Sequence, residues 1–196
     1  MFGLDFIGIY DNALPSPQCK EVIQWIETQS LSKGLGYGLK GKPQYNPKFK
    51  DSWDISNKFS NKNFVDLKIR HVLNKYTPSY RGSYPSLDLL DPWMVYDVYN
   101  IQKYDPGGGY HMIHCENCGG PNDIKRVMAW MIYLNTVTDK GGTYFSSYNK
   151  TIKAKEGRLV IWPAYFTHPH KGGVSKTQTK YIATGWYAYE VPCCNN

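Results

Sequence analysis

The sequence predicts an α+β fold that is mainly β: a double-sheet jelly roll with two N-terminal helices packed on one of its sheets. Two observations favour this class. From residue 92 onward, short runs rich in Val, Ile, Tyr and Trp alternate with turns that contain glycine or small polar residues, a pattern typical of strands. Eight such runs follow one another, which fits a jelly roll or cupin-like barrel, also called a double-stranded β-helix.

The segment before these runs predicts one short strand and two helices. A strand is expected over 5–10. Ser16 as N-cap, followed by a proline at the first helical position, predicts a helix over 17–30. Apolar residues at helical spacing predict a second helix over 63–76.

Eight strands are expected in the second half of the chain. They cover 93–104, 110–116, 127–135, 143–147, 151–155, 158–162, 167–171 and 180–191. A length of 196 residues is most simply one domain, spanning 1–196. Within it, residues 1–91 would supply helical support and a flexible loop, and residues 92–191 would form the β core.

Composition and charge argue against several classes of protein. No apolar run approaches the roughly 20 residues of a membrane helix. The net charge of +7 comes largely from scattered lysines, with no arginine-rich tract, so nucleic-acid binding is not favoured. The N-terminus lacks a signal-peptide pattern, and five cysteines, an odd number, indicate a reduced, cytoplasmic setting.

Two histidine clusters indicate a metal site. His114 and Glu116 are two positions apart, so in a strand both side chains point to one face and can bind one ion. His168 and His170 also share a face, and this spacing alone does not choose between them as the third ligand. Two histidines and one carboxylate are the ligand set of non-haem Fe(II) oxygenases, which leave the opposite face of the metal open.

Several motifs around these ligands resemble one family. They are Tyr-Asp-Pro-Gly-Gly-Gly-Tyr at 104–110, His-x-Glu at 114–116, Ile-Tyr-Leu-Asn at 132–135, Gly-Gly-Thr-Tyr-Phe at 141–145 and Lys-Tyr-Ile-Ala-Thr-Gly-Trp at 180–186. Over roughly residues 92–190, in this order, they resemble the prolyl 4-hydroxylase type of 2-oxoglutarate/Fe(II) dioxygenase.

The resemblance implies the roles of particular residues. The iron ligands would be His114, Glu116 and His170, since the family places a basic residue about ten positions after its distal histidine. That basic residue is Lys180, which would bind the distal carboxylate of 2-oxoglutarate. The other implied positions are Tyr104, Tyr133 and Thr184 in the cosubstrate pocket, and Trp186, His168 and Tyr110 beside the metal or the substrate.

The family's chemistry implies Fe(II) as the metal, 2-oxoglutarate as cosubstrate and ascorbate as an accessory reductant. Oxidative decarboxylation of the keto acid to succinate and CO2 is coupled to hydroxylation of a substrate C–H bond, while the protein binds, orients and excludes water. A proline-containing peptide or protein is the implied substrate. The long unpatterned segment 31–58 would be a flexible cover over the active site.

One ligand departs from the family pattern. The usual carboxylate is Asp, whereas this chain has Glu116, whose extra methylene carries its oxygens further from the backbone. We still predict an active Fe(II) site, because Tyr104 and Lys180 are in place. Two alternatives keep the fold: the same chemistry on a nucleobase or small molecule, and a non-catalytic cupin-like binding module. The oligomeric state is left open, with a monomer the simplest case.

The cysteines offer a second metal hypothesis. Cys115, Cys118, Cys193 and Cys194 supply four thiolates, the number that a structural zinc ion needs. Adjacent cysteines chelate a tetrahedral ion poorly, and Cys115 lies between two of the iron ligands. Free thiols are therefore the favoured interpretation.

Overall fold

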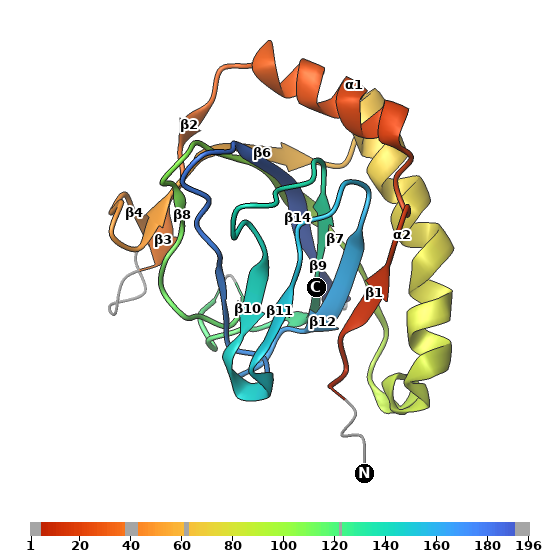
Figure 1. Ribbon diagram of the computed structural model, residues 1–196. Coiled ribbons are helices and arrows are strands. Elements are labelled where there is room, and N and C mark those ends of the chain that lie inside the picture. The colour runs from red at the N-terminus through yellow and green to blue at the C-terminus, as the bar shows by residue number, and fades with distance from the viewer. Residues whose placement is uncertain (1–4, 38–42, 61–62, 122, 191–196) are drawn as a thin grey trace, which may run out of the picture.

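The computed structural model describes residues 5–37, 43–60, 63–121 and 123–190 (Figure 1). Two β-sheets form its centre, and two helices, α1 (Ser16–Glu27) and α2 (Phe64–Ser83), cover the outer face of the larger sheet. The predicted class, a mainly β jelly roll with N-terminal helices packed on one sheet, is confirmed.

The larger sheet has seven antiparallel strands. Their spatial order is β1 (Gly8–Tyr10), β12 (Leu159–Pro163), β9 (Arg126–Tyr133), β14 (Lys180–Tyr189), β7 (Trp93–Tyr104), β6 (Trp53–Lys58) and β2 (Ser32–Lys33). Central strand β14 pairs with both β7 and β9, so Lys180 lies opposite Tyr104 and Ile182 lies opposite Tyr133. Segments that are distant in sequence therefore meet on neighbouring strands.

The smaller sheet and the connecting elements are short. The smaller sheet has the order β11 (Lys150–Ile152), β10 (Thr143–Phe145) and β13 (His170–Gly172). Two further ribbons pair β3 (Gly36–Tyr37) with β4 (Pro43–Gln44), and β5 (Lys50–Asp51) with β8 (Gly109–Tyr110). Two short 3₁₀ helices, η1 (Pro85–Leu89) and η2 (Ser146–Tyr148), complete the described elements.

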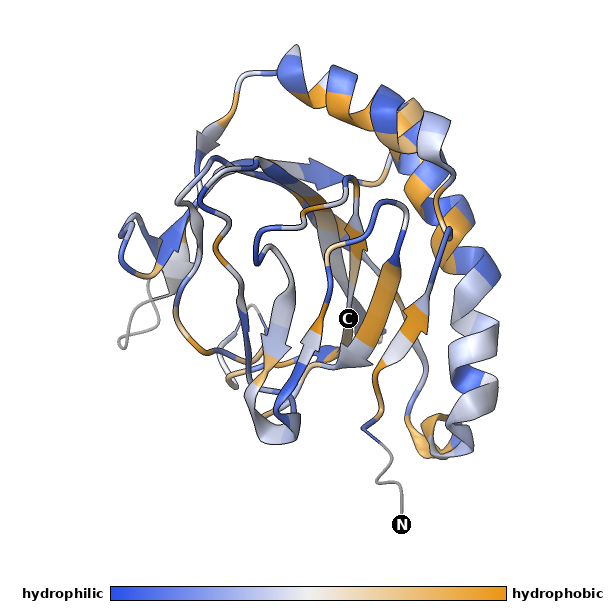
Figure 2. Cartoon of the chain, in the orientation of Figure 1, coloured by the Kyte–Doolittle hydropathy of each residue, from blue (hydrophilic) through white to orange (hydrophobic). Residues whose placement is uncertain are grey.

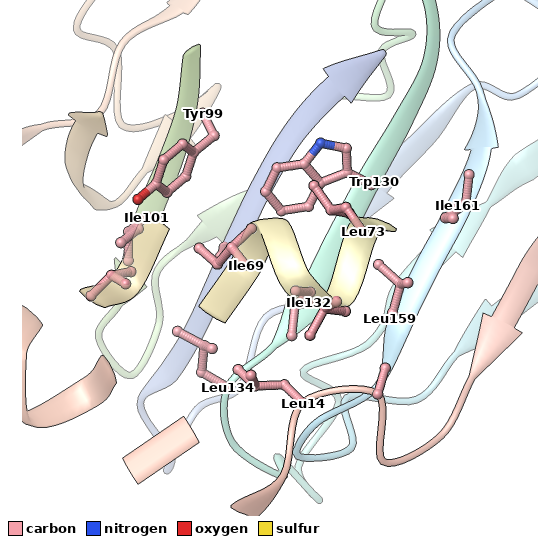
Figure 3. Close-up of a cluster of buried hydrophobic side chains, with 14 of the residues drawn as sticks. Leu14, Ile69, Leu73, Tyr99, Ile101, Trp130, Ile132, Leu134, Leu159 and Ile161 are labelled. Atoms are coloured by element: carbon pink, nitrogen blue, oxygen red, sulfur yellow. The ribbon is translucent and has the colours of Figure 1, made fainter. Parts of the chain in front are cut away.

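The main apolar core lies between the helices and the outer face of the larger sheet. In Figure 3, Ile69 and Leu73 of α2 lie close to Trp130 and Ile132 of β9, and all four side chains are fully buried. Figure 2 shows that α1 is hydrophobic on its side toward the sheet and hydrophilic on the other. Each such side chain stabilises the fold by roughly 1.5–3 kcal/mol relative to exposure.

Both helices differ from the prediction at their ends, and α1 stops at Glu27, three residues before the predicted end at Ser30. The predicted N-cap at Ser16 is wrong, because α1 already includes Ser16, and Pro15 precedes it without any side-chain cap. Helix α2 continues past its predicted end and contains Pro78. Tyr80 explains this extension: it is 2% exposed, and its hydroxyl donates to the Phe6 carbonyl at 2.8 Å. Tertiary packing thus offsets the cost of an internal proline.

The predicted strand over 110–116 is wrong for most of its length. Strand β8 ends at Tyr110, and beyond it only His114 is paired, through an isolated bridge with His170. The backbone N–H groups of Glu116 and Asn117 both donate to the Ala164 carbonyl, at 3.0 and 2.8 Å. Two successive N–H groups on one acceptor are incompatible with a regular strand ladder.

The segment 31–58, which was predicted to be a flexible cover, contains regular strands. Strand β6 pairs with β7 along all six of its residues, so residues 53–58 are part of the larger sheet. Residues 38–42 of the expected cover lie outside the described residues. Together with β1 and β2, β6 shows that the N-terminal half supplies strands as well as helices to this sheet.

The remaining predicted strands agree with the structure to different degrees. Strand β7 has the predicted bounds, and β1 and β9 to β14 overlap their predicted ranges with shifted ends. Val191, the last residue of the predicted final strand, lies outside the described residues. None of the helices in the described ranges is long and apolar enough to cross a membrane.

Candidate metal centre and cosubstrate pocket

A short backbone bridge brings the two histidine segments together. His114 N donates to the His170 carbonyl at 2.9 Å, and His170 N donates to the His114 carbonyl at 2.8 Å. Oε1 of Glu116 lies 3.3 Å from His170 Nε2 and 3.7 Å from His114 Nε2. Within the described ranges, these three residues are the one group of three or more His, Cys, Asp or Glu side chains whose ligand atoms all lie within 4.8 Å of one another.

The orientation of both imidazoles suits metal binding. His114 Nδ1 lies 3.1 Å from the Met112 carbonyl, and His170 Nδ1 lies 3.0 Å from the His168 carbonyl. Because a carbonyl only accepts, each Nδ1 carries the proton and each Nε2 has a free lone pair. Metal–ligand bonds of about 2.1 Å separate neighbouring ligand atoms by about 3 Å, so only small shifts are needed. This donor set matches Fe(II).

Aromatic rings hold the two histidines in place. The ring of Tyr110 stacks on His114 with centroids 3.7 Å apart and an interplanar angle of 12°. Phe145 and Trp162 lie 5.3 and 5.1 Å from the His170 ring. These contacts limit the rotation of both imidazoles, so the ligands are preorganised.

The electrostatics of the triad also favour a metal. Burial lowers the pKa of His114, and the neighbouring His170 lowers it further. Burial alone would raise the pKa of Glu116, but the two imidazoles outweigh this effect and hold it well below its usual value. Glu116 is therefore a carboxylate, and the lowered pKa of His114 favours loss of the proton that a metal ion would replace.

A tryptophan and an arginine hold the unusual glutamate. Trp186 Nε1 donates to Glu116 Oε2 at 2.8 Å, while Oε1 faces the histidines. Arg126 donates to the Glu116 carbonyl at 2.9 Å, and its guanidinium lies 3.7 Å from the Trp186 ring centroid. One carboxylate oxygen is thus held away from the ligand position, which directs the longer side chain. No spacing in the sequence identifies Arg126 as a residue of the metal site.

Lys180 lies inside the barrel without an anionic partner. It is 4% exposed, and its Nζ donates to the Gly173 carbonyl at 3.1 Å. No carboxylate in the described part of the chain lies within ion-pair distance of it. Burial lowers the pKa of Lys180 to about 8. A buried ammonium group without an anion is costly, so the site suits a carboxylate ligand such as that of a keto acid.

Two predicted tyrosines lie in the interior close to this lysine. The Tyr104 ring centroid is 4.6 Å from Lys180 Nζ, and its hydroxyl donates to Gln102 Oε1 at 2.7 Å. The Tyr133 hydroxyl lies 2.7 Å from Thr143 Oγ1. Burial raises the pKa of both tyrosines, so both remain protonated at neutral pH. Thr143 lies in the Gly-Gly-Thr-Tyr-Phe motif at 141–145, but no role was predicted for it from the sequence.

The other predicted positions are less suited to ligand binding. Thr184 donates its proton to the Trp130 carbonyl at 2.9 Å. His168 is 1% exposed, with Nε2 2.8 Å from the Asp5 carbonyl and Nδ1 2.8 Å from Thr167 Oγ1. Both ring nitrogens are therefore used in the wall of the barrel, and the structure does not support a place for His168 beside the substrate.

The described cysteines are free thiols. Cys115 and Cys118 have Sγ atoms 3.6 Å apart, and Cys19 is buried elsewhere. Cys193 and Cys194, the other two thiols of the zinc hypothesis, lie outside the described residues.

Comparison with known proteins gives two kinds of similarity. Residues 99–188 match the family model described as the 2OG-Fe(II) oxygenase superfamily. A search of curated protein sequences found no match. Several solved structures of prolyl hydroxylases have a similar fold.

Three of these structures illustrate the similarity. The viral collagen prolyl hydroxylase vCPH from Paramecium Bursaria Chlorella virus-1, as its 2OG complex, has a TM-score of 0.70 and 20% identity, over 94% of this chain and 97% of that one. A Pseudomonas putida prolyl-4-hydroxylase has a TM-score of 0.67 and 12% identity, over 94% and 93%. A Trichoplax adhaerens prolyl hydroxylase, in complex with a hypoxia inducible factor oxygen degradation domain peptide fragment, has a TM-score of 0.65 and 17% identity, over 94% and 84%.

The matched region includes the metal triad, Lys180 and both interior tyrosines. The triad supplies the ligands that Fe(II) requires, and the buried lysine supplies a cation for the keto acid. The chain therefore matches the 2OG-Fe(II) oxygenase superfamily over residues 99–188, carries there a ligand set and a buried cation that suit Fe(II) and 2-oxoglutarate, and has the fold of the prolyl 4-hydroxylases.

Proposed function

We propose that this oxygenase hydroxylates prolyl residues of a peptide or protein, with succinate and CO2 as coproducts. The observation that supports this most is the metal triad beside buried Lys180, inside a fold whose similar structures include prolyl hydroxylases from a virus, a bacterium and an animal. One of those proteins is named for collagen, and another is described with a bound peptide.

Each part of the site has a distinct task in this proposal. His114, Glu116 and His170 hold Fe(II), which supplies the activation of dioxygen when bound. Lys180 binds the distal carboxylate of 2-oxoglutarate, and Tyr133 forms part of the polar wall of that pocket. The surrounding apolar interior excludes water, which strengthens the attraction between the ammonium group and the carboxylate.

The rim of the site suits a peptide with apolar side chains. Met112 and Ile113, directly before His114, are 46% and 51% exposed, and Phe166 is 81% exposed. Phe166 follows the Ala164 segment, whose carbonyl accepts from the Glu116 N–H. Apolar groups are therefore exposed on both segments beside the metal ligands. Proline is an apolar residue that favours extended peptides, which such a rim could contact.

The test uses the whole chain with Fe(II), 2-oxoglutarate, ascorbate and a set of proline-rich peptides. Mass spectrometry should show a peptide that gains one oxygen atom on a proline, and succinate should form in equal amount. A His170→Ala variant is the control, because it lacks a ligand and should give neither product.

If succinate forms but no peptide is oxidised, the protein is an oxygenase that does not act on these prolyl peptides. The same assay with nucleosides and small acids would then identify which alternative substrate class applies. Failure of the parent protein to consume 2-oxoglutarate would reject the enzymatic function altogether.

A further inference from the structure

A buried polar network connects β5 and β6 with Tyr104 at the cosubstrate pocket. Its centre is Asp54, whose Oδ2 lies 2.5 Å from Lys50 Nζ and 3.3 Å from Gln102 Nε2. Ser52 Oγ donates to the other oxygen, Oδ1, at 2.7 Å. Lys50, Ser52, Gln102 and Tyr104 are all at most 6% exposed. A network this well buried must have a defined direction of hydrogen bonding.

The ion pair with Lys50 fixes that direction. A carboxylate only accepts, so the Gln102 side chain must present its NH2 group to Asp54. The amide oxygen of Gln102 then faces the Tyr104 hydroxyl, 2.7 Å away. Tyr104 has a single hydroxyl proton, and burial raises its pKa well above 10, so this proton is present and is donated to Gln102.

This arrangement has a consequence for any anion beside Lys180. Tyr104 lies opposite Lys180 in the register of β7 and β14, with the lysine Nζ 4.6 Å from its ring centroid. While the proton of Tyr104 is bound to Gln102, the hydroxyl oxygen offers only lone pairs to the pocket. A keto acid carboxylate also has only lone pairs, so the two groups repel each other. Attraction requires that Tyr104 turn its proton away from Gln102.

We propose that Gln102, oriented by Asp54, is an affinity-determining residue for the cosubstrate because it competes with the keto acid carboxylate for the proton of Tyr104. This inference rests on the proposed binding of 2-oxoglutarate beside Tyr104 and Lys180. Gln102 acts through Tyr104, so it is a positioning residue. When the keto acid takes the proton, the buried amide oxygen of Gln102 loses its partner, and the binding affinity is reduced accordingly.

The test measures the dissociation constant of 2-oxoglutarate in the anaerobic protein loaded with Mn(II), by isothermal titration calorimetry. Replacement of Gln102 by Leu removes the competing acceptor, so binding should become about threefold to tenfold tighter. The same substitution in a Tyr104→Phe background should give no gain, because the contested proton is gone. Gln24→Leu, on the exposed face of α1, is the matched control and should leave the dissociation constant unchanged.

The sign and the dependence on Tyr104 distinguish this role from a purely structural one. Unchanged or weaker binding by Gln102→Leu would overturn the inference, as would an equal gain in the Tyr104→Phe background. Thermal melting checks that each variant folds, and Gln102→Met, which also lacks a strong acceptor, replaces any leucine variant that does not. If the parent binds no 2-oxoglutarate, the proposed function fails together with this inference. If the parent binds it and Gln102→Leu has no effect, only the inference fails.

Discussion

The two faces of the larger sheet differ in what they bury. On the outer face, Tyr187 of β14 belongs with Ile69 and Trp130 to a cluster of apolar and aromatic side chains closed by α1 and α2. On the inner face, the same strand presents Lys180 and Trp186 to the metal triad and the keto acid pocket. One strand therefore serves a conventional core on one side and a site with unmatched polar groups on the other.

The difference shows how the fold can hold a costly site. Burying Lys180 without an anion destabilises the folded state, and the apolar contacts of the outer face stabilise it. The two faces bury different sets of side chains, and they approach each other sterically at one glycine of β14. A Cβ on Gly185 would lie 2.6 Å from the Trp130 ring, so a glycine is required in β14 directly before Trp186. Variants on each face should therefore affect different measurements.

The largest expected effect comes from removing a ligand on the inner face. His170→Ala should abolish stable Fe(II) binding and lower turnover on the order of 10³-fold or more, because the contribution of the metal to catalysis is lost. Metal binding is measured by calorimetry with Mn(II), and turnover by succinate formation. The fold should persist, since the outer cluster is unchanged.

His168→Ala is the matched control for that variant. The His168 side chain bonds to the Asp5 carbonyl, and alanine keeps the backbone carbonyl that accepts from His170 Nδ1, so the variant should lower the melting temperature and leave metal affinity within about twofold. Equal loss of metal binding in both variants would contradict the ligand assignment.

The second effect is on the outer face. Leu73→Ala leaves a cavity in the cluster beneath α2 and should lower the free energy of unfolding by about 3 kcal/mol. Chemical denaturation measures this change, and the affinity of the folded variant for Mn(II) should stay within about twofold of the parent. A large loss of metal affinity in the folded variant would show that the two faces are not independent.

Part of the difference between the two faces of the larger sheet could be predicted from the sequence. The helical spacing of Ile69 and Leu73 is a local pattern, and it correctly indicates a face that packs on a sheet. The strand over residues 93–104 is long and bounded by prolines, so both of its ends were predicted. Spacing predicted His114 and Glu116 as ligands and the family resemblance added His170, although the strand that was expected to align His114 with Glu116 does not form.

Other parts of the site depend on tertiary contacts that leave no local pattern. The triad converges through a bridge between His114 and His170, two segments far apart in the chain. The spacing of His168 and His170 does not choose between them, and the structure shows the physical reason for the choice in the bonds of each ring. Lys50 is one lysine among many in sequence, and its partner Asp54 was assigned to a flexible segment. Periodicity cannot identify such pairs.

A third, smaller effect is a pH dependence that separates binding from stability. Burial lowers the pKa of Lys180 from 10.5 to about 8, so above pH 8 the free protein loses the cation that the keto acid needs. The affinity for 2-oxoglutarate should be nearly constant below pH 8 and fall about tenfold per pH unit above it, until the pKa of the complex is reached. Titrations between pH 7 and pH 9.5, roughly the window of this pKa, measure the effect.

The stability of the ligand-free protein should change in the opposite direction. Between pH 8 and pH 10.5 the unfolded chain binds more protons at Lys180 than the folded one, so this residue makes unfolding less favourable as pH rises. Lys180→Arg should remove both trends, because arginine stays charged throughout. The parent protein should lose affinity for 2-oxoglutarate about tenfold as the pH rises to 9.5. If its affinity stays constant over this range, Lys180 is not the carboxylate partner.

The smallest effect concerns the residue that holds the glutamate ligand. Trp186→Phe keeps an aromatic ring beside Arg126 but removes the N–H that donates to Glu116 Oε2 at 2.8 Å. The freed carboxylate can rotate, so the dissociation constant for Mn(II) should rise about fivefold, or ~1 kcal/mol. Tyr187→Phe, one position along on the outer face, removes a hydroxyl that lies 2.7 Å from Thr77 Oγ1 and should change only stability. If both variants weaken metal binding equally, the hydrogen bond from Trp186 does not orient Glu116, and another contact must compensate for its extra methylene.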